Sequence, residues 1–212
     1  MTADALQVIA EDRAVTVVRA PQPFDVGSLV TALATGGLRA VELTLTTPDI
    51  LARLGGASID DGAVIGVGTV LTAEDAEAAI DAGARFLVTP AVREAVAGVA
   101  AARNVPVIMG AYTPTEVMAA VDLGAAAVKI FPARTGGPDY VRDLRGPFPG
   151  VALIPSGGIS AGNAASYLAA GATAVTAGTD VVAPELVDAA NWTVITDRAR
   201  GFVAAISGQG GD

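Results

Sequence analysis

The sequence predicts one domain with the (β/α)8 TIM barrel fold, preceded by an extra N-terminal helix. Eight short β-rich runs alternate with longer alanine-rich amphipathic segments, at intervals of roughly 20 to 25 residues. Most of the runs are continuously apolar, as expected for parallel strands that are covered on both faces. We expect the barrel over residues 1–207 and a flexible glycine-rich tail over 208–212. An open doubly wound sheet uses the same local pattern and remains the alternative.

The elements follow in a regular order. A helix over residues 3–11 comes first and is expected to cover the N-terminal mouth of the barrel. The predicted strands that follow it are AVTVVRA (14–20), AVELTL (40–45), VIGVGTV (64–70), FLVTP (86–90), VPVIMGA (105–111), AVKIFPA (127–133), VALIPSGG (151–158) and AVTAGT (174–179).

The segments between the strands carry helix boundary signals. Several end in a glycine shortly before the next strand, in TGGLRAVEL, DAGARFL, DLGAAAV and AAGATAV. Four hydroxyl residues are placed to cap helix starts: Thr47 before Pro48, Thr72, Thr113 before Pro114, and Ser160. The helices are therefore expected to begin close behind the strand ends.

Composition excludes several kinds of chemistry. The chain has no cysteine and no histidine, which removes disulfides, thiol catalysis and the commonest metal ligand, and we expect neither a metal nor a cofactor. The net charge of −9 argues against binding to nucleic acid. Apolar residues make up 52% of the chain, but no apolar run approaches the roughly 20 residues that cross a bilayer. The first residues do not resemble a signal peptide, so we expect a cytoplasmic protein that does not bind membranes.

Lys129 is the most informative residue, because the other twelve cationic side chains are arginines. It lies within the apolar run AVKIFPA, where an ammonium would cost several kcal/mol unless it were paired or deprotonated. A lysine whose stem reaches outward, or that pairs with a buried carboxylate, is the structural alternative. Arginine cannot become an amine nucleophile, so a single lysine at a buried strand position points to amine chemistry.

Glu42 is the natural partner of this lysine. It lies in the apolar run AVELTL, and no histidine is available to act in its place. If the amine of Lys129 formed a Schiff base with a substrate carbonyl, a carboxylate at position 42 could move protons to and from the substrate through a water molecule. A simple buried ion pair with Lys129 or Arg19 is the alternative.

The remaining candidates lie at the carboxyl ends of the predicted strands, where barrel enzymes carry their active groups. Arg19 and Thr69, at the ends of the first and third runs, could bind a substrate carboxylate, although Arg19 could equally be an ordinary surface residue. The seventh and eighth runs end in glycines that could hold a phosphate on backbone N–H groups, although glycines are also ordinary turn residues. The residues of this predicted phosphate end are Ser156, Gly157, Gly158, Gly178 and Thr179.

Taken together, these residues resemble the class I 2-keto-3-deoxy-6-phosphogluconate (KDPG) aldolases and their 2-keto-3-deoxygalactonate and 4-hydroxy-2-oxoglutarate (KHG) aldolase relatives. The matching runs occur in family order and span most of the chain: VVRA, GGLRAVELTLTTPD, IGVGTVLT, VTP, TPTE, VKIFPA, GGPDYVRDLRGPFP and IPSGGIS.

The resemblance implies a role for each candidate. Lys129 would be the Schiff-base lysine and Glu42 the glutamate that shuttles protons. Arg19 and Thr69 would bind the substrate carboxylate. Phe131 and Pro132 would line the pocket, and the glycines of the seventh and eighth runs would form the phosphate end. The resemblance also implies a homotrimer.

The sequence departs from the family pattern at four places. Thr46 stands where some members have an arginine, which leaves more of the carboxylate recognition to Arg19. Thr179 replaces a common serine and Ser156 a common threonine, and both changes keep a hydroxyl. Met109 precedes Gly110 where a proline is frequent. These changes bear on which sugar acid is used.

The expected activity is reversible cleavage of KDPG to pyruvate and glyceraldehyde 3-phosphate. Three alternatives remain at this point. One is a related aldolase acting on 2-keto-3-deoxy-6-phosphogalactonate or 4-hydroxy-2-oxoglutarate. Another is a phosphate-binding barrel isomerase or epimerase with Glu42 as the base. The third is a barrel that has lost catalysis and serves in binding or assembly.

Overall fold

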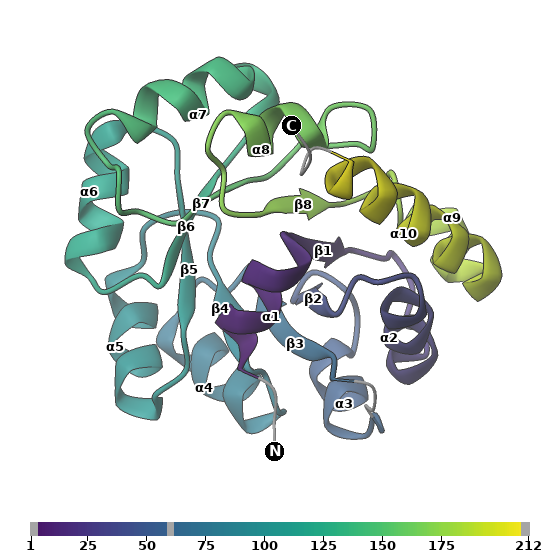
Figure 1. The fold of residues 1–212 in the computed structure, drawn as a ribbon. Helices are drawn as coiled ribbons and strands as arrows, with labels where there is room; N and C mark the ends of the chain where they lie inside the picture. Colours follow the sequence, from purple (N-terminus) through teal and green to yellow (C-terminus); the bar gives the residue numbers. More distant parts are fainter. Residues whose placement is uncertain (1–3, 59–61, 209–212) are drawn as a thin grey trace.

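The computed structural model describes residues 4–58 and 62–208. Eight parallel strands form a nearly closed barrel with helices around the outside (Figure 1). Neighbouring strands are hydrogen-bonded in the order β7-β6-β5-β4-β3-β2-β1-β8, so the last strand of the chain lies beside the first. The predicted (β/α)8 TIM barrel is confirmed.

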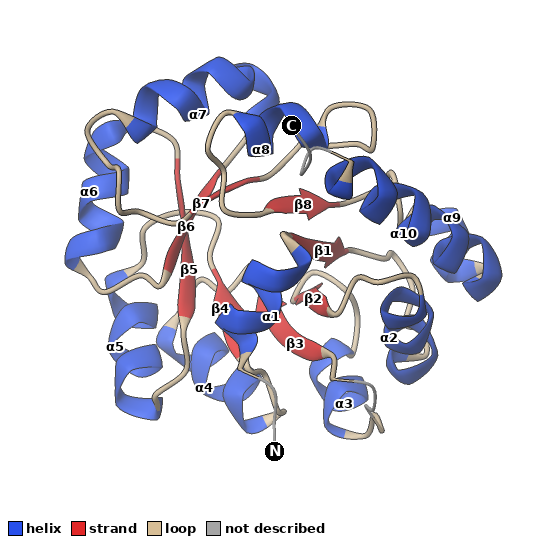
Figure 2. Cartoon of the chain, in the orientation of Figure 1, coloured by secondary structure: helices blue, strands red, loops and turns tan. Residues whose placement is uncertain are grey.

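Each predicted run contains one strand, and Figure 2 shows these strands enclosed by helices. The strands are β1 (Ala14–Val18), β2 (Ala40–Thr44), β3 (Val64–Gly68), β4 (Phe86–Val88), β5 (Val107–Ala111), β6 (Ala127–Ile130), β7 (Leu153–Pro155) and β8 (Val175–Ala177). The helices are α1 (Ala5–Asp12), α2 (Val26–Thr35), α3 (Ile50–Gly55), α4 (Ala73–Asp81), α5 (Glu94–Arg103), α6 (Pro114–Asp122), α7 (Gly137–Arg145), α8 (Ala164–Ala169), α9 (Pro184–Asp188) and α10 (Trp192–Ser207), with a 3-10 turn, η1 (Ala133–Thr135). Residues 209–212 of the predicted tail lie outside the described residues.

Two of the four predicted helix caps are confirmed. Thr72 accepts a hydrogen bond from the N–H of Asp75, and the Asp75 carboxylate accepts one from the N–H of Thr72. Thr113 and Glu116 form the same reciprocal pair at the start of α6. The glycines predicted to end helices adopt the left-handed conformation that glycine permits, with positive φ at Gly37, Gly83, Gly124 and Gly171.

The other two caps are wrong, because an extra turn separates each residue from its helix. The helix α3 begins after Asp49, and the Thr47 hydroxyl instead accepts a hydrogen bond from the backbone N–H of Ala20 at 3.2 Å. The helix α8 begins after Asn163, whose side chain accepts from the N–H of Ser160 at 2.9 Å. An asparagine bonded in this way favours a turn ahead of the helix.

Apolar side chains fill the N-terminal half of the barrel interior. The helix α1 lies across this end (Figure 1), and its Val8 and Ile9 pack with inward-facing residues of the strands. The Phe86 ring also lies in this half, and a Cβ at Gly66 would come within 2.4 Å of it. As predicted, the N-terminal helix therefore covers this mouth of the barrel.

The hydrogen-bonded sheet is interrupted between β7 and β8, which are its two ends. A single backbone hydrogen bond, from the N–H of Thr173 to the carbonyl of Leu153 at 2.9 Å, links the segments at their N-terminal side. The strands β7 and β8 form no further ladder within the described residues. The loops that follow them are therefore not joined by strand pairing at the C-terminal side of the barrel.

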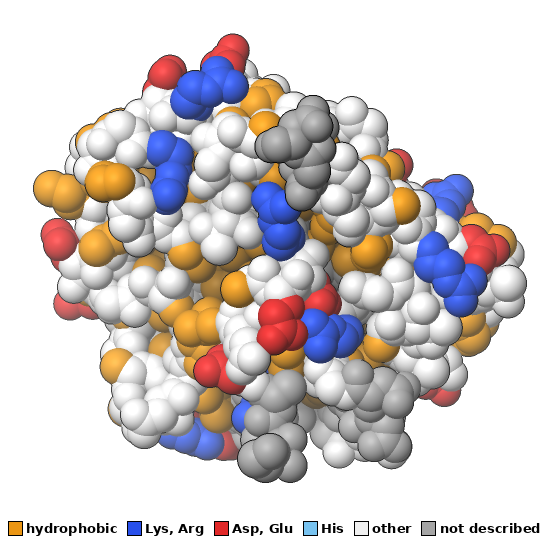
Figure 3. All heavy atoms as spheres, in the orientation of Figure 1, with side chains coloured by type: hydrophobic (Ala, Val, Ile, Leu, Met, Phe, Trp, Pro, Cys, Tyr) orange, Lys and Arg blue, Asp and Glu red, His pale blue; other side chains and the backbone are white. Residues whose placement is uncertain are grey.

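The outer surface carries small mixed groups of acidic and basic side chains on the face seen in Figure 3. Within residues 4–58 and 62–208, none of the helices combines the length and apolar character needed to cross a bilayer.

Candidate active site

A cavity of about 490 Å³ lies at the carboxyl ends of the strands. Ten of the eleven predicted site residues line it. Pro132, which follows Phe131 through a cis peptide bond, does not contribute to the lining. The complete lining is Val17, Arg19, Glu42, Thr69, Pro90, Lys129, Phe131, Arg134, Ser156, Gly157, Gly158, Ile159, Thr176, Gly178, Thr179 and Val182.

Lys129 of β6 and Glu42 of β2 meet across the barrel. The Lys129 Nζ lies 3.4 Å from Oε1 and 3.3 Å from Oε2 of Glu42. The side chains are 11% and 2% exposed, so both charged groups have been withdrawn from bulk water into the cavity wall. Such a pair offers a proton acceptor beside the amine, which the amine must have before it can act as a nucleophile.

Gly68, at the end of β3, makes room for this pair. A Cβ at Gly68 would lie only 2.0 Å from Oε1 of Glu42. The glutamate side chain therefore occupies space that any other residue at position 68 would fill. Gly68 and Glu42 lie on the paired strands β3 and β2. The direct partner of Gly68 in this pairing is Thr44, two residues after Glu42.

Arg19 and Thr69 lie on another side of the cavity and contact each other. The Arg19 Nη2 is 3.4 Å from the hydroxyl oxygen of Thr69. Arg19 is exposed, as its alternative interpretation required, but its side chain also lines the cavity. Thr69 has a φ of 63°, which a β-branched residue rarely adopts and which is typical of functional positions.

The Phe131 ring contacts both ends of the site. Its centroid lies 5.9 Å from the Nζ of Lys129, within the range of a cation–π interaction. A Cβ at Gly157 would come within 3.2 Å of the same ring. Phe131 is 43% exposed, so it forms part of the rim.

The loops after β7 and β8 form the predicted phosphate end. Gly157 and Gly158 have φ values of 89° and 84°, a conformation that requires glycine. In the described part of the chain, no acceptor is found for the backbone N–H groups of Gly157, Gly158, Gly178 and Thr179. The Asp180 carboxylate accepts a hydrogen bond from the N–H of Ala161 at 2.7 Å, which ties the two loops together.

The helix starts expected directly behind these glycines are not found there. The helices α8 and α9 begin only at Ala164 and Pro184, and they have six and five residues. Asn163 also donates to the carbonyl of Gly158 at 2.9 Å, so the intervening chain forms a turn of its own. Any anion bound here would contact N–H groups of the loops rather than the first turn of a helix.

Two of the departures from the family pattern lie outside the cavity. Thr46 is exposed and does not line it, and the hydroxyl of Thr46 lies 3.1 Å from that of Thr44. Met109 is fully buried in the core between the barrel and its helices, away from the interior of the barrel. Arg19 is therefore the cation placed beside Thr69.

Sequence reasoning missed Thr176 and Arg134. Thr176 lies on β8, two residues before Gly178, and its position in the apolar run AVTAGT was a usable signal. Arg134 lies in η1 directly behind β6, so it too follows a strand end. Both residues line the cavity.

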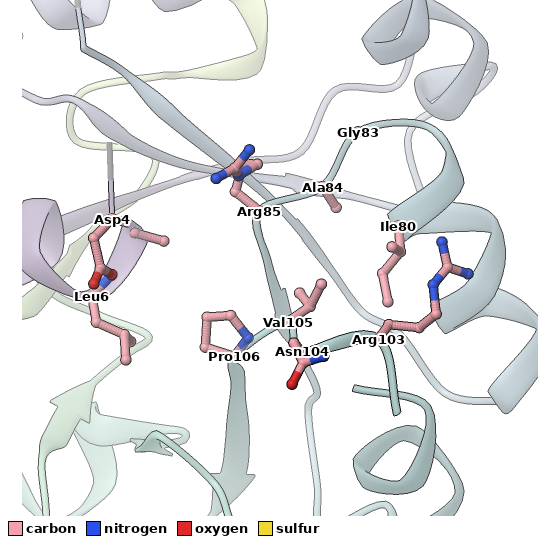
Figure 4. A pocket seen from close by; sticks show the side chains of 11 residues that line it. Asp4, Leu6, Ile80, Gly83, Ala84, Arg85, Arg103, Asn104, Val105 and Pro106 are labelled. Atoms are coloured by element: carbon pink, nitrogen blue, oxygen red, sulfur yellow. The ribbon is translucent and has the colours of Figure 1, made fainter. Parts of the chain in front are cut away.

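A second pocket, of about 730 Å³, lies at the other end of the barrel. Figure 4 shows its wall, with Asp4, which caps α1, and Leu6 of α1 on one side and Ile80 and Arg103 on the other. The Arg103 guanidinium is bound to Glu77 and Asp81. None of the predicted site residues lines this larger pocket, and ten of the eleven line the smaller cavity.

Known proteins resemble this chain over most of its length. The family model "KDPG and KHG aldolase" matches residues 6–198. A 2-dehydro-3-deoxy-phosphogluconate aldolase of Pseudomonas aeruginosa is 34% identical over 192 residues, which cover 90% of this chain and 87% of that protein. A probable 2-dehydro-3-deoxy-6-phosphogalactonate aldolase of Rhizobium meliloti is 34% identical over 173 residues, covering 80% and 82%.

A solved structure gives the same result for the fold. The KDPG aldolase of Legionella pneumophila, with pyruvate captured at low pH as a covalent carbinolamine intermediate, has a TM-score of 0.82 and 27% identity. The match covers 95% of this chain and 99% of that one. The fold, the cavity and these similarities agree, and the chain belongs to the KDPG and KHG aldolase family.

Proposed function

We propose that this enzyme is a class I aldolase that cleaves KDPG to pyruvate and glyceraldehyde 3-phosphate, with Lys129 as the Schiff-base residue and Glu42 as the proton carrier. The observation that supports it best is the buried pair at 3.3 Å, in which the only lysine of the chain faces a carboxylate inside the cavity. The carbinolamine described for the Legionella relative supports an amine mechanism for this fold.

In the proposed reaction, Glu42 takes a proton from Lys129, and the free amine attacks the C2 carbonyl of the substrate. The C=O π electrons move to the oxygen, which is protonated, and loss of water leaves an iminium ion. The C3–C4 bond then breaks, and its electron pair moves into the iminium to give an enamine. The C4 hydroxyl passes its proton to the Glu42 carboxylate, through a water molecule, as the aldehyde departs. Protonation at C3 and addition of water release pyruvate and restore the amine. These steps require neither a metal nor a cofactor.

The proposed reaction fits more than one substrate. Arg19 and Thr69 would bind the C1 carboxylate, with Phe131 packed beside the reacting carbons. The probable galactonate aldolase of Rhizobium meliloti makes the C4 epimer the competing substrate. Values of kcat/KM for KDPG, for 2-keto-3-deoxy-6-phosphogalactonate and for 4-hydroxy-2-oxoglutarate would decide which is preferred.

Borohydride trapping tests the covalent step. Reduction in the presence of pyruvate should add the mass of reduced pyruvate to the peptide that contains Lys129, and mass spectrometry locates it. Lys129→Arg should form no adduct and have no measurable aldolase activity, because arginine keeps the charge but not the nucleophile. An isomerase or epimerase would turn over without an adduct, so an active wild-type enzyme that gives no adduct at Lys129 contradicts the proposal.

We also propose the homotrimer that the family resemblance implies. Met118 and Val121, three residues apart on α6, are 56% and 43% exposed, which provides apolar surface for contact with another subunit. Sedimentation equilibrium should give three times the chain mass of 20.9 kDa. A single species of 20.9 kDa would contradict this assembly. The cytoplasmic location stays a prediction.

A further inference from the structure

The cavity holds more positive charge than the proposed chemistry uses. Its lining contains three cations, Arg19, Lys129 and Arg134, but only one carboxylate, that of Glu42. Glu42 pairs with Lys129, and Arg19 contacts Thr69. Within residues 4–58 and 62–208, the Arg134 guanidinium forms no ion pair or hydrogen bond, although the chain as a whole carries a net charge of −9.

Arg134 is held against the loop after β7 by its own backbone. Its N–H donates to the carbonyl of Gly157 at 3.0 Å. Its side chain packs so closely on Gly158 that a Cβ there would lie 2.7 Å from the Cβ of Arg134. The hydroxyl of Tyr167, on α8, donates to the carbonyl of Ala133 at 3.2 Å and fixes the adjoining residue of the turn.

Two buried hydroxyl groups face the same region. Ser156 and Thr176 are 5% and 4% exposed, both line the cavity, and neither side chain has a hydrogen-bond partner in the described part of the chain. Three other buried threonines are bonded: Thr44 to Thr46, Thr47 to Ala20, and Thr89 to Ala91. Thr16, the remaining one among the described residues, has no partner but does not line the cavity. Buried hydroxyls normally have partners, so two that lack one and face a cavity indicate a ligand.

We propose that Arg134 is a specificity-determining residue that binds a phosphate group at the end of the substrate remote from the keto carbon. This inference rests on the proposed function and adds to it a residue that sequence reasoning did not assign. The donors at this end are four free N–H groups, the two hydroxyls of Ser156 and Thr176, and one guanidinium. They suit the three oxygens of a phosphate better than the two of a carboxylate, and a guanidinium binds phosphate through two parallel hydrogen bonds.

Arg134→Gln and Arg134→Lys test the assignment, with Arg142→Gln as the control. Arg142 lies on α7, is exposed, is bound to Asp139 and does not line the cavity, so its substitution makes the same change of net charge elsewhere. Cleavage of KDPG and of unphosphorylated 2-keto-3-deoxygluconate is followed by the pyruvate released. Cleavage of 4-hydroxy-2-oxoglutarate is measured as well, because this substrate has a carboxylate instead of a phosphate at the end remote from the keto carbon.

We expect Arg134→Gln to lower kcat/KM for the phosphorylated substrate at least tenfold and to change that for the unphosphorylated substrate less than twofold. Arg134→Lys should lower kcat/KM for the phosphorylated substrate by less than Arg134→Gln does, since lysine keeps the charge but cannot form the two parallel hydrogen bonds of a guanidinium. Equal losses on both substrates, or no loss on either, would overturn the assignment. If Arg134→Gln lowered kcat/KM selectively for 4-hydroxy-2-oxoglutarate, Arg134 would bind a carboxylate instead of a phosphate, and the assignment would likewise be overturned.

The pyruvate adduct separates this inference from the proposed function. The borohydride-trapped adduct at Lys129 should form equally in wild type, Arg134→Gln and Arg142→Gln, because pyruvate has no group that reaches the distal end. A wild-type enzyme without the adduct would contradict the proposed function. An adduct present in all three proteins with unchanged phosphate selectivity would overturn the role of Arg134 alone.

Discussion

Single residues could be predicted from the sequence where residue type and strand position act together. Lys129 and Glu42 stand out as charged residues within apolar strands, and they meet at 3.3 Å. Thr176 carries a similar signal, as a polar residue within the apolar run of β8, whereas Arg134 could not be selected in this way. Whether a side chain behind a strand reaches the cavity depends on the path of the turn, and for Arg134 that path is set by its hydrogen bond to Gly157, which is remote in sequence.

Glu42→Gln tests the division of labour within the buried pair. The amide keeps the shape of the side chain but cannot accept a proton, so turnover should fall by about 10²-fold or more. The amine of Lys129 remains, so borohydride should still trap pyruvate on it, but more slowly than in wild type, because the amine has lost the carboxylate that takes its proton. Stopped assays of aldol cleavage and the mass of the trapped peptide give the two measurements.

The control for this change is Glu74→Gln on α4, an exposed glutamate that does not line the cavity, which should behave as wild type. If Glu42→Gln retained wild-type turnover, Glu42 would be no more than a counter-ion for the lysine.

The strands were predicted well, because each leaves an apolar run in the sequence. Helix starts were predicted poorly where hydrogen bonds shape the loop that precedes the helix. All eight strands lie inside the predicted runs, because a buried parallel strand leaves a continuous apolar segment. The starts of α3 and α8 lie later than expected, because Thr47 bonds to another strand's end and Asn163 closes a turn ahead of its helix. The first bond joins residues that are remote in sequence, whereas the second joins residues three apart and makes a local turn that the capping pattern of Ser160 did not reveal.

The start of α6 offers a pH-dependent test of one element. The N–H groups of Thr113 and then Tyr112 donate to Glu116 and hold the pKa of its carboxyl below its usual value. A lowered pKa in the folded state means that the ionised form adds stability above the unfolded pKa of about 4.3, and that this is lost as pH falls further. Wild type should therefore exceed Glu116→Gln in stability at pH 7, and the gap should close below about pH 4.

Urea unfolding at both pH values measures the gap, and a gap that does not change with pH would contradict the assignment. Thr113→Ala removes the other half of the same cap and should cost about 1 kcal/mol in the free energy of unfolding. Thr72 and Asp75 form an equivalent cap on α4 that stays intact in these variants.

The whole molecule separates stability from chemistry along the barrel axis. The N-terminal half of the interior is closed by apolar side chains and by α1, which is anchored through Asp12 to Arg39 at 2.5 Å. The C-terminal half contains the cavity, where Gly68 makes room for the charged pair. The direction of parallel strands predicts which end carries the chemistry, but the size of the cavity depends on packing that sequence patterns do not specify.

Ile9→Ala tests this separation. Ile9 is 3% exposed beneath the barrel, and its truncation should lower the free energy of unfolding by about 2–5 kcal/mol while leaving KM unchanged. Leu6→Ala, on the exposed side of the same helix, should change stability by no more than about 0.5 kcal/mol. A large rise in KM for folded Ile9→Ala would show that the two ends are coupled.

The solitary, recessed primary amine at position 129 has a practical consequence for handling the protein. Reagents that acylate amines, such as activated esters used for dyes and surface coupling, find no lysine on the exterior, since arginines supply the remaining cationic side chains. Only the chain's α-amino group competes with the one lysine for the label. Labelling at the lysine should inactivate the enzyme. A keto acid bound in the cavity should protect the lysine, so the activity retained at increasing keto acid concentration would measure the fraction of occupied sites.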